Sequence, residues 1–305
     1  MQIAISGANG LVGSAVVRAA TARGDVVRRL VRREARAADE IAWNPAAGAV
    51  PGDLAGCDAV VHLAGAGIAD RPWTRARRQV LVESRVDATR KLAESLVPGG
   101  PATLVMASAV GYYGDRGAEV LSEQSAPGEG FLARLTRDWE AAAEPAREAG
   151  ARVVPLRFGV ILARDGGALA RMLPAFRLGL GARLGSGEQF FPWVSLDDVV
   201  EVILRALDDA TLTGPVNVVA PGSATNAEFT RTLAGVLHRP AFFVAPAWVL
   251  RLALDGLAEE GLLASQRVRP AALEAVGFPF RDPALRPALA RILASGRVGD
   301  PDDRR

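Results

Sequence analysis

The first thirteen residues constrain this chain more than any other segment. A short apolar run, Gln2 to Ser6, leads directly into Gly7-Ala8-Asn9-Gly10-Leu11-Val12-Gly13. At this spacing the first glycine permits a sharp exit from a strand, the second lets the backbone approach a pyrophosphate, and the third lets the following helix pack closely. The pattern predicts a dinucleotide-binding turn, with the phosphates at the N-terminus of a helix from about Leu11 to Arg23.

Glycine-rich turns are common between elements of all kinds, so an ordinary tight turn is the alternative interpretation. A second strand pattern at Val26 to Val31 lies at the spacing of a βαβ unit, which favours the nucleotide site. We expect the turn to contact the nucleotide through Gly7, Asn9, Gly10, Leu11, Val12 and Gly13.

The residues after the second strand indicate which nucleotide is preferred. An NAD site usually has an acidic residue there for the ribose 2′-hydroxyl, whereas an NADP site tends to have arginine for the 2′-phosphate. This chain has Arg32 and Arg33, and a guanidinium offers a phosphate two parallel donors. We therefore expect NADP(H), with Arg32 as the first choice and Arg33 as the second. The alternatives are Glu34 on a ribose, or an arginine-rich surface that is simply solvated.

Composition argues against several other classes of protein. No run of about 18 uncharged apolar residues occurs, and Met1 leads into a strand without a signal-peptide pattern, so we expect no membrane span and a cytoplasmic location. One cysteine and two histidines leave no disulfide framework and no Cys/His cluster, so no metal is expected. The net charge is only +2, which makes a poor case for a nucleic-acid partner.

Strand and helix patterns alternate along the chain, which predicts an α/β fold with a Rossmann-type, doubly wound parallel sheet. The 305 residues suit a nucleotide domain at residues 1–160 and a smaller C-terminal substrate lobe at residues 161–305. Within the lobe, residues 196–220 are expected to return to the main sheet. Long helices are expected at about residues 75–96 and 131–149, and the polar stretch 296–305 is expected to fray.

Several segments, in order along nearly the whole chain, resemble the extended short-chain dehydrogenase/reductases. The GxxGxxG loop of that superfamily is matched by GANGLVG, its fourth-strand motif by DAVVHLAG, and its serine-bearing fifth strand by MASAVGYYG. The atypical branch labelled "epimerase family protein", which carries a small C-terminal domain of unknown function, is resembled more narrowly by PWTRARRQVLVESR, FLARLTRDWEAAA, LRFGVIL and LLASQRVRPAALEAVGFPF. The resemblance implies that the turn at Leu63, Ala64 and Gly65 passes the adenosine side of the cofactor.

Ordinary members of the superfamily use a serine, a tyrosine and a lysine four residues after the tyrosine. This chain has one lysine, Lys91, and two tyrosines, so no Tyr-x-x-x-Lys occurs in it. If Trp139-Glu140 is aligned with the acidic landmark of the family, Leu132 falls at the tyrosine position and Thr136 at the lysine position. The usual acid/base pair is therefore absent.

Another group must then move the proton, or no reaction occurs. Ser108 stands at the serine position, where it binds a substrate oxygen or merely caps the strand end. We hypothesise that Tyr112 or Tyr113 is the acid/base, assisted by Ser108 and by a cation, either Arg157 or Arg85. Tyrosines that only wall the pocket are the competing interpretation.

Arg85 is also counted among the cofactor-binding residues, because it falls where the family pattern has a structural asparagine. His62, on a strand end, is expected to be a packing histidine. Ser195 and Asp198 are expected to begin a helix rather than to form an acidic site.

Two classes of function follow. The first is an NADP(H)-dependent oxidoreductase or epimerase acting on a small carbonyl, alcohol or sugar-like substrate, with a homo-oligomer as a compatible assembly. The second is a nucleotide-sensing protein that has lost its proton relay. We favour the enzyme because Ser108, Tyr112, Tyr113 and Arg157 keep the pocket polar.

Overall fold

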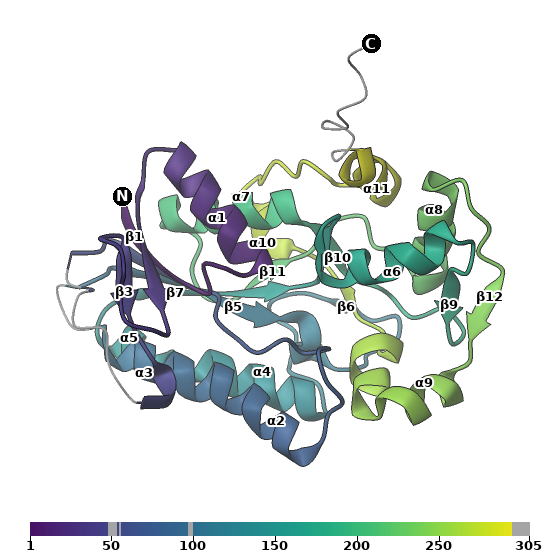
Figure 1. The fold of residues 1–305 in the computed structure, drawn as a ribbon, viewed down its shortest axis with the longest axis horizontal. Helices are drawn as coiled ribbons and strands as arrows, with labels where there is room; N and C mark the ends of the chain where they lie inside the picture. Colours follow the sequence, from purple (N-terminus) through teal and green to yellow (C-terminus); the bar gives the residue numbers. More distant parts are fainter. Residues whose placement is uncertain (48–53, 55, 97–99, 295–305) are drawn as a thin grey trace, which may run out of the picture.

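The computed structural model describes residues 1–47, 54, 56–96 and 100–294, and a seven-stranded parallel sheet lies at its centre (Figure 1). The strand order is β11-β7-β5-β4-β1-β2-β3. The chain changes direction across the sheet between β1 and β4, and doubly wound sheets bind ligands at such a point. The predicted Rossmann-type fold is confirmed. The strands are β1 (Gln2–Ser6), β2 (Val26–Val31), β3 (Glu40–Ala42), β4 (Ala59–His62), β5 (Thr103–Ala109), β7 (Arg152–Phe158) and β11 (Val216–Val218).

Helices cover both faces of this sheet. One face carries α1 (Leu11–Ala22), α7 (Leu196–Asp208) and α10 (Ala271–Ala275). The other carries α3 (Ala88–Glu94), α4 (Phe131–Ala141) and α5 (Glu144–Glu148). Because both faces are covered, the central strands are apolar along most of their length, as in β4, which is buried throughout.

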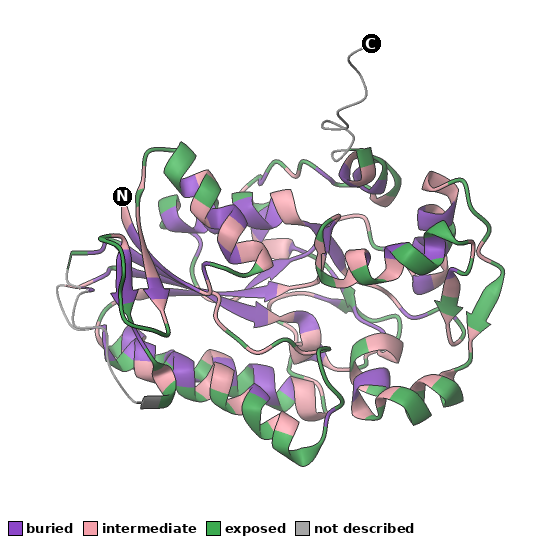
Figure 2. Cartoon of the chain, viewed as in Figure 1, coloured by how far each residue is buried: buried purple, intermediate pink, exposed green. Residues whose placement is uncertain are grey.

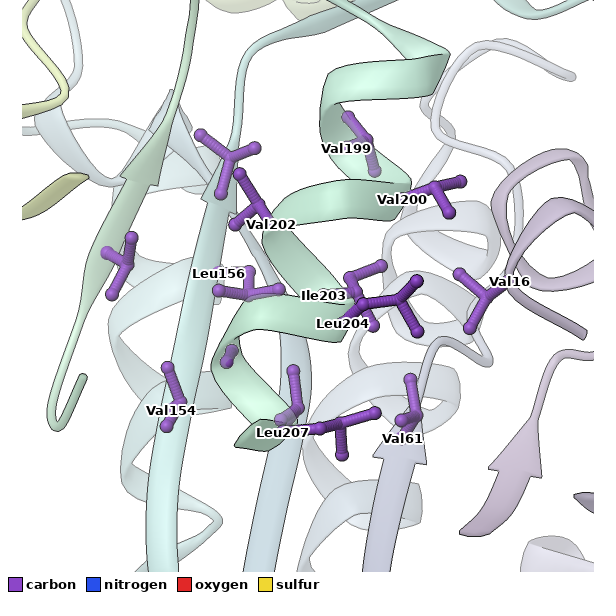
Figure 3. Close-up of a cluster of buried hydrophobic side chains, with 14 of the residues drawn as sticks. Val16, Val61, Val154, Leu156, Val199, Val200, Val202, Ile203, Leu204 and Leu207 are labelled. Carbon is purple, nitrogen blue, oxygen red and sulfur yellow. The ribbon is translucent and has the colours of Figure 1, made fainter. Parts of the chain in front are cut away.

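Helix α7 supplies much of the core on its face. Its buried residues recur at helical spacing, and Figure 3 shows Val202 beside Leu156 of β7, with Val200 and Leu204 facing Val16 of α1. The Oγ of Ser195 accepts a hydrogen bond from the N–H of Asp198 at 3.2 Å, which confirms the predicted helix start. Through α7 and β11, residues 196–220 lie against the main sheet.

Two helices predicted as single elements are more complex in the structure. The first consists of α2 (Arg75–Val82), a π-helical turn η2 (Glu83–Asp87) and α3, which follow one another without a gap. The second stops after α4 and restarts as α5, where Pro145 occupies a first-turn position that needs no N–H donor. The predicted frayed stretch, residues 296–305, lies outside the described residues.

The remaining elements form a smaller lobe beyond the carboxyl ends of the strands (Figure 1). It contains helices and three two-stranded sheets, and its core includes Trp193, Phe229 and Leu289. The elements are β6 (Val120–Leu121), β8 (Val160–Ala163), α6 (Gly167–Arg177), β9 (Ala182–Leu184), β10 (Trp193–Ser195), α8 (Asn226–Val236), β12 (Phe243–Ala245), α9 (Ala247–Leu254), β13 (Arg267–Val268) and α11 (Leu285–Ala294).

The lobe also caps one of the helices that cover the main sheet. Glu260, in the π-helical turn η4 (Ala258–Leu263), accepts hydrogen bonds from the N–H groups of Phe131 and Leu132 at 3.0 and 2.7 Å. Gly130 offers α4 no side-chain cap, so Glu260 satisfies donors that the start of the helix leaves open. Strands β6 and β13 pair in parallel nearby and join the same two parts of the chain.

The outer edge of the lobe exposes apolar side chains. Helix α9 has no buried residue, and Phe242, Trp248 and Leu252 are 87%, 67% and 83% exposed (Figure 2). Among the described residues, no helix combines the length and the apolar character needed to cross a bilayer.

Candidate active site

The glycine turn between β1 and α1 depends on two of its glycines for its shape. Gly7 has a φ of +70°, and a Cβ there would lie 2.8 Å from the carbonyl carbon of Leu63. A Cβ at Gly13 would overlap the Gly7 oxygen, so α1 starts this close to the turn only with glycine. Gly10 is different, because its φ of −76° suits any residue and the nearest atom to a Cβ is 3.2 Å away. A Cβ there would lie tightly against the Gly7 oxygen, and a larger side chain would enter the cleft that Gly10 lines.

The N-terminus of α1 is open to an anion. The helix has no side-chain cap and no acidic residue in its first turn, so its first N–H groups and its dipole remain available. A cleft of about 680 Å³, a size typical of ligand sites, opens beside it, and its lining includes Asn9, Gly10 and Arg164. Leu11 packs against Gly166, so the turn after β8 forms one wall of this cleft.

The two candidate arginines beyond β2 have different surroundings. Arg33 donates to both carboxylate oxygens of Glu40 at 2.8 and 2.7 Å, and this pairing lowers the pKa of Glu40 to about 2. Arg32 is exposed and makes no hydrogen bond or ion pair within the described part of the chain. Glu34 is exposed as well. Of the two arginines, Arg32 is thus the one available to a 2′-phosphate.

Ser6 and His62 hold the ends of β1 and β4 together beneath the turn. The Oγ of Ser6 lies 2.6 Å from Nδ1 of His62 and accepts hydrogen bonds from the N–H groups of Leu63 and Ala64. Burial lowers the pKa of His62 to about 4, so the ring is neutral near pH 7. His62 is a packing residue, as predicted, and it fixes the turn that follows β4.

Arg85 approaches the same turn from the helical side. It lies in η2, and a Cβ at Gly65 would lie 3.6 Å from its guanidinium carbon. Its Nη2 donates to the carbonyl of Ala66 at 2.9 Å, and its guanidinium lies 5.2 Å from the centroid of the Trp139 ring. Arg85 is therefore held between the end of β4 and helix α4.

One carboxylate joins Ser108 on β5 to Arg157 on β7. Glu140 of α4 accepts a hydrogen bond from Oγ of Ser108 at 2.6 Å, and bonds from Nε and Nη2 of Arg157 at 2.8 Å each. Burial lowers the pKa of Arg157 and the pairing with Glu140 raises it, with a net rise. Because Ser108 donates its proton to Glu140, its lone pairs remain for a donor such as a substrate hydroxyl.

The two tyrosines of the 3₁₀ turn η3 (Val110–Tyr113) have different roles. Tyr113 is fully buried, and its hydroxyl donates to Oδ1 of Asn217 at 2.7 Å and accepts from Nη1 of Arg157 at 2.9 Å. Burial raises the pKa of Tyr113. Tyr112 is half-buried, its ring centroid lies 3.5 Å from the Arg157 guanidinium carbon, and its hydroxyl has no partner among the residues that the structure describes. The surroundings of Tyr113 thus do not suit proton transfer to a ligand, and Tyr112 alone keeps an uncommitted proton.

The positions of the missing tyrosine and lysine offer no replacement. A Cβ built at Gly111 would lie 3.3 Å from the Cβ of Leu132, so Leu132 packs against η3. Thr136 is buried and donates its hydroxyl proton to the carbonyl of Leu132 at 2.8 Å. Neither side chain supplies a cation or an acid.

Glu140 is the polar residue that sequence reasoning missed. The sequence motifs used Glu140 only to align the helix with the family pattern. Its position one helical turn after Thr136 places it on the same face of α4 as Thr136. Glu123 was missed as well: its carboxylate accepts hydrogen bonds from the N–H groups of Asn217 and Ala272 at 3.0 and 3.1 Å. Within the described residues, no group of three or more His, Cys, Asp or Glu side chains is placed to hold a metal ion.

These features together define a Rossmann-type protein of the atypical short-chain dehydrogenase/reductase class. They are the uncapped helix after the glycine turn, the available arginine beyond β2 and the buried serine–carboxylate–arginine cluster on β5 and β7. The chain belongs to the NAD dependent epimerase/dehydratase family, whose model matches residues 3–220. A second model, a domain of unknown function (DUF1731), matches residues 245–292. The resemblance inferred from the sequence motifs is confirmed.

Similar proteins cover nearly the whole chain. Epimerase family protein Mb2239 of Mycobacterium bovis is 45% identical over 288 residues, which are 94% of this chain and 96% of the relative. The crystal structure of the human epimerase family protein SDR39U1 (isoform 2) with NADPH is 35% identical, with a TM-score of 0.87 over 96% of this chain and 99% of that one. A nucleoside-diphosphate sugar epimerase from Corynebacterium glutamicum is 36% identical, with a TM-score of 0.81 over 97% of this chain and 58% of that one.

Proposed function

We propose that this chain binds NADP(H) and acts as an oxidoreductase or epimerase on a small carbonyl, alcohol or sugar-like substrate, without a Tyr-x-x-x-Lys pair. The observation that carries the proposal is one line of groups along the carboxyl edge of the sheet: Arg32 after β2, the open N-terminus of α1 after β1, and Ser108 on β5. In the order β2-β1-β4-β5, three strand spacings of about 4.8 Å separate the first from the last, roughly 14 Å. An extended dinucleotide is comparable in length, and the human relative is crystallised with NADPH.

The residues along this line fit such a cofactor. The N–H groups of Leu11 and Val12 would hold the pyrophosphate, since α1 has no side-chain cap and Gly10 lines the cleft beside its N-terminus. Arg32 would hold the 2′-phosphate, with Arg33 retained by Glu40 beside it. On the proposed path, the turn from Leu63 to Gly65 would flank the adenosine side.

When bound, NADP(H) would supply hydride transfer, and the residues at the end of β5 would handle the proton and the substrate oxygen. Tyr112 would exchange the accompanying proton, because its hydroxyl is uncommitted, while Ser108 would accept a hydrogen bond from a substrate hydroxyl. Arg157 would supply a fixed positive charge under the Tyr112 ring, held in place by Glu140. Tyr113 positions Arg157 from behind.

A nucleotide-sensing protein is the second candidate. The observation in its favour is that Ser108 and Arg157 are each only 2% exposed and bind Glu140. A sensor would leave NADPH unoxidised with every carbonyl in a broad substrate panel, whereas the enzyme would oxidise NADPH with at least one of them.

Calorimetry with NADPH and NADH tests the cofactor assignment. A charge-assisted contact from Arg32 to the 2′-phosphate should make NADPH bind about ten- to a hundredfold more tightly. The variant Arg32→Ala should lose this preference. Arg33→Ala, the matched control, should keep it, because Arg33 is already bound to Glu40. Equal affinities in the parent would overturn the assignment.

A pair of neighbouring variants tests the proton donor. Tyr112→Phe removes the uncommitted hydroxyl and should lower turnover by about 10²- to 10⁴-fold with NADPH affinity unchanged. Tyr113→Phe should lower turnover much less than Tyr112→Phe does, because its hydroxyl acts only through Arg157, and it should lower stability, because that hydroxyl joins Asn217 to Arg157. The opposite pattern, or equal turnover in both variants, would rule out Tyr112.

Three further expectations stay predictions: a nucleotide domain at residues 1–160 with a lobe at 161–305, a cytoplasmic location, and a homo-oligomer. The homo-oligomer can be tested by changing the exposed side chains of Phe242, Trp248 and Leu252 and measuring the molecular mass in solution.

A further inference from the structure

The outer edge of the lobe carries a group of exposed apolar side chains, called here the lobe-edge surface. Its elements lie side by side, because β12 pairs with β9 and a Cβ at Gly179 would lie 3.3 Å from Pro240 (Figure 1). A cluster of this kind on one edge of a protein marks a site of interaction. Its members are Leu178, Leu180, Phe242, Phe243, Val244, Trp248, Val249 and Leu252.

The two segments that form the lobe-edge surface contain no acidic residue. Residues 166–187 and 229–254 have neither Asp nor Glu, but they have six arginines, Arg171, Arg177, Arg183, Arg231, Arg239 and Arg251. Two of the six form ion pairs with carboxylates outside these segments. The other four form no ion pair within the described residues, so the surface has an excess of positive charge.

Three of the unpaired arginines lie next to the apolar side chains. Arg183 stands opposite Val244 in the β9–β12 pair, so the two side chains leave the sheet on the same side. Arg177 precedes Leu178 in the chain, and its carbonyl accepts a hydrogen bond from Nε of Arg239 at 2.9 Å. The positive charge therefore borders the apolar side chains directly.

This charge distinguishes between the possible partners. In a symmetric dimer the same surface of a second copy would face it, and like charges would meet. A bilayer with anionic lipids offers phosphate groups to the arginines and hydrocarbon to the apolar side chains. Leu178, Phe242 and Leu252 are 75%, 87% and 83% exposed, so they protrude rather than line a groove for a peptide. Tryptophan and arginine both favour the boundary between lipid headgroups and acyl chains.

We propose that the lobe-edge surface binds an anionic lipid bilayer. Phe242, Trp248 and Leu252 insert among the acyl chains, and the bordering arginines pair with lipid phosphates. Helix α9 has only eight residues, so the burial of apolar side chains and the attraction of charges are both needed for binding. The protein then lies on the membrane with its nucleotide-binding half in water.

The chain contains its own reporter of insertion. Of its five tryptophans, all in the described part of the chain, Trp248 is 67% exposed and the other four are between 1% and 5% exposed. Vesicles of equal parts phosphatidylcholine and phosphatidylglycerol, added to the full chain, should shift the emission of Trp248 to shorter wavelength and protect it from the neutral quencher acrylamide. Vesicles of phosphatidylcholine alone should do neither.

Sedimentation with the mixed vesicles separates the two contributions to binding. Leu252→Ser should weaken binding about ten- to a hundredfold, by the loss of a buried leucine side chain. The double variant Arg177→Gln with Arg183→Gln should weaken it about fivefold for each arginine. Val26→Ser at the start of β2 and Arg90→Gln on α3 are the matched controls, since both side chains are exposed and lie outside the lobe-edge surface, and neither change should affect binding.

Several outcomes would overturn the proposal. One is a parent chain that does not bind the mixed vesicles, or that binds phosphatidylcholine alone equally well. Another is a set of variants at residues 177, 183 and 252 that bind like the controls while remaining folded in urea unfolding. An emission shift without vesicles, together with a doubled molecular mass, would assign the surface to a second copy instead. Equally tight binding of soluble polyglutamate would assign it to an acidic protein.

Discussion

The variant Glu140→Gln tests how far the cluster on β5 and β7 depends on a single carboxylate. Glu140 accepts two hydrogen bonds from Arg157 and one from Ser108, and the side chains of Arg157 and Glu140 are only 3% and 13% exposed. Water therefore has little access to replace a lost contact. The amide keeps the shape of the carboxylate, but it removes the charge and turns an NH₂ group toward one of the three donors.

The expected cost follows from the remaining partners of Arg157. Without Glu140, the contacts left to its guanidinium among the described residues are the hydroxyl and ring of Tyr113, a 3.4 Å contact to the Glu123 carbonyl and the Tyr112 ring. Removing one partner of a buried ion pair costs about 3–5 kcal/mol, so the free energy of unfolding should fall by that amount. The melting temperature should fall by roughly 5–8 °C.

Urea unfolding of the parent and two variants provides the measurement. Glu144→Gln is the matched control, because its ion pair with Arg147 is 35% and 58% exposed and is worth at most about 1 kcal/mol. If Glu140→Gln is destabilised no more than Glu144→Gln, the buried pair does not hold Arg157 in place and the reasoning fails.

Three further predictions concern the turn, the cap and the buried histidine. Gly10→Val should abolish nucleotide binding in calorimetry, since Gly10 lines the cleft and a side chain there would enter it. The chain should still fold, because the φ of Gly10 suits valine, with some loss in the free energy of unfolding from the 3.2 Å approach of the new Cβ to the Gly7 oxygen. Full nucleotide binding would contradict the assigned turn. Glu260→Ala should lower the free energy of unfolding by about 0.5–2 kcal/mol in urea, and Glu259→Ala, which removes only an exposed ion pair, should lower it less. In the variant His238→Gln, His62 is the one histidine left. Its free energy of unfolding should fall by roughly 3 kcal/mol as the pH drops from 6.5 to 4. The reason is that the histidine of the unfolded chain takes up a proton in this range, whereas the buried ring of the folded chain does not. The further change His62→Gln should remove this part of the pH dependence of the free energy of unfolding, measured in urea. An unchanged slope would show that His62 is not its cause.

Features that depend on neighbouring residues were predictable from the sequence. The glycine turn is one of them, because a positive φ at Gly7 and close packing at Gly13 are local requirements that only glycine meets. The alternation of strands and helices, and with it the parallel sheet, was predictable in the same way from apolar runs at βαβ spacing.

Features that depend on contacts between distant elements could not be predicted from the sequence. Arg33 is held by Glu40 because β2 and β3 pair with Arg29 opposite Glu40, and no sequence pattern states that register. Tyr112 and Tyr113 are adjacent and chemically identical, so only the packing of η3 on β7 decides which hydroxyl is enclosed. The π-turn that contains Arg85 is likewise invisible in a stretch with ordinary helix propensity.

The cap that Glu260 places on α4 has a consequence for synthesis, since 129 residues separate Glu260 from Phe131 along the chain. At about 5–20 residues per second, a ribosome adds that carboxylate roughly 6 to 26 s after the first turn of α4. A nascent chain that stops near residue 220 has made every strand of the main sheet, yet α4 still lacks its partner. The nucleotide half therefore reaches its final form only after the C-terminal segment has emerged, which makes the end of translation a step in its maturation.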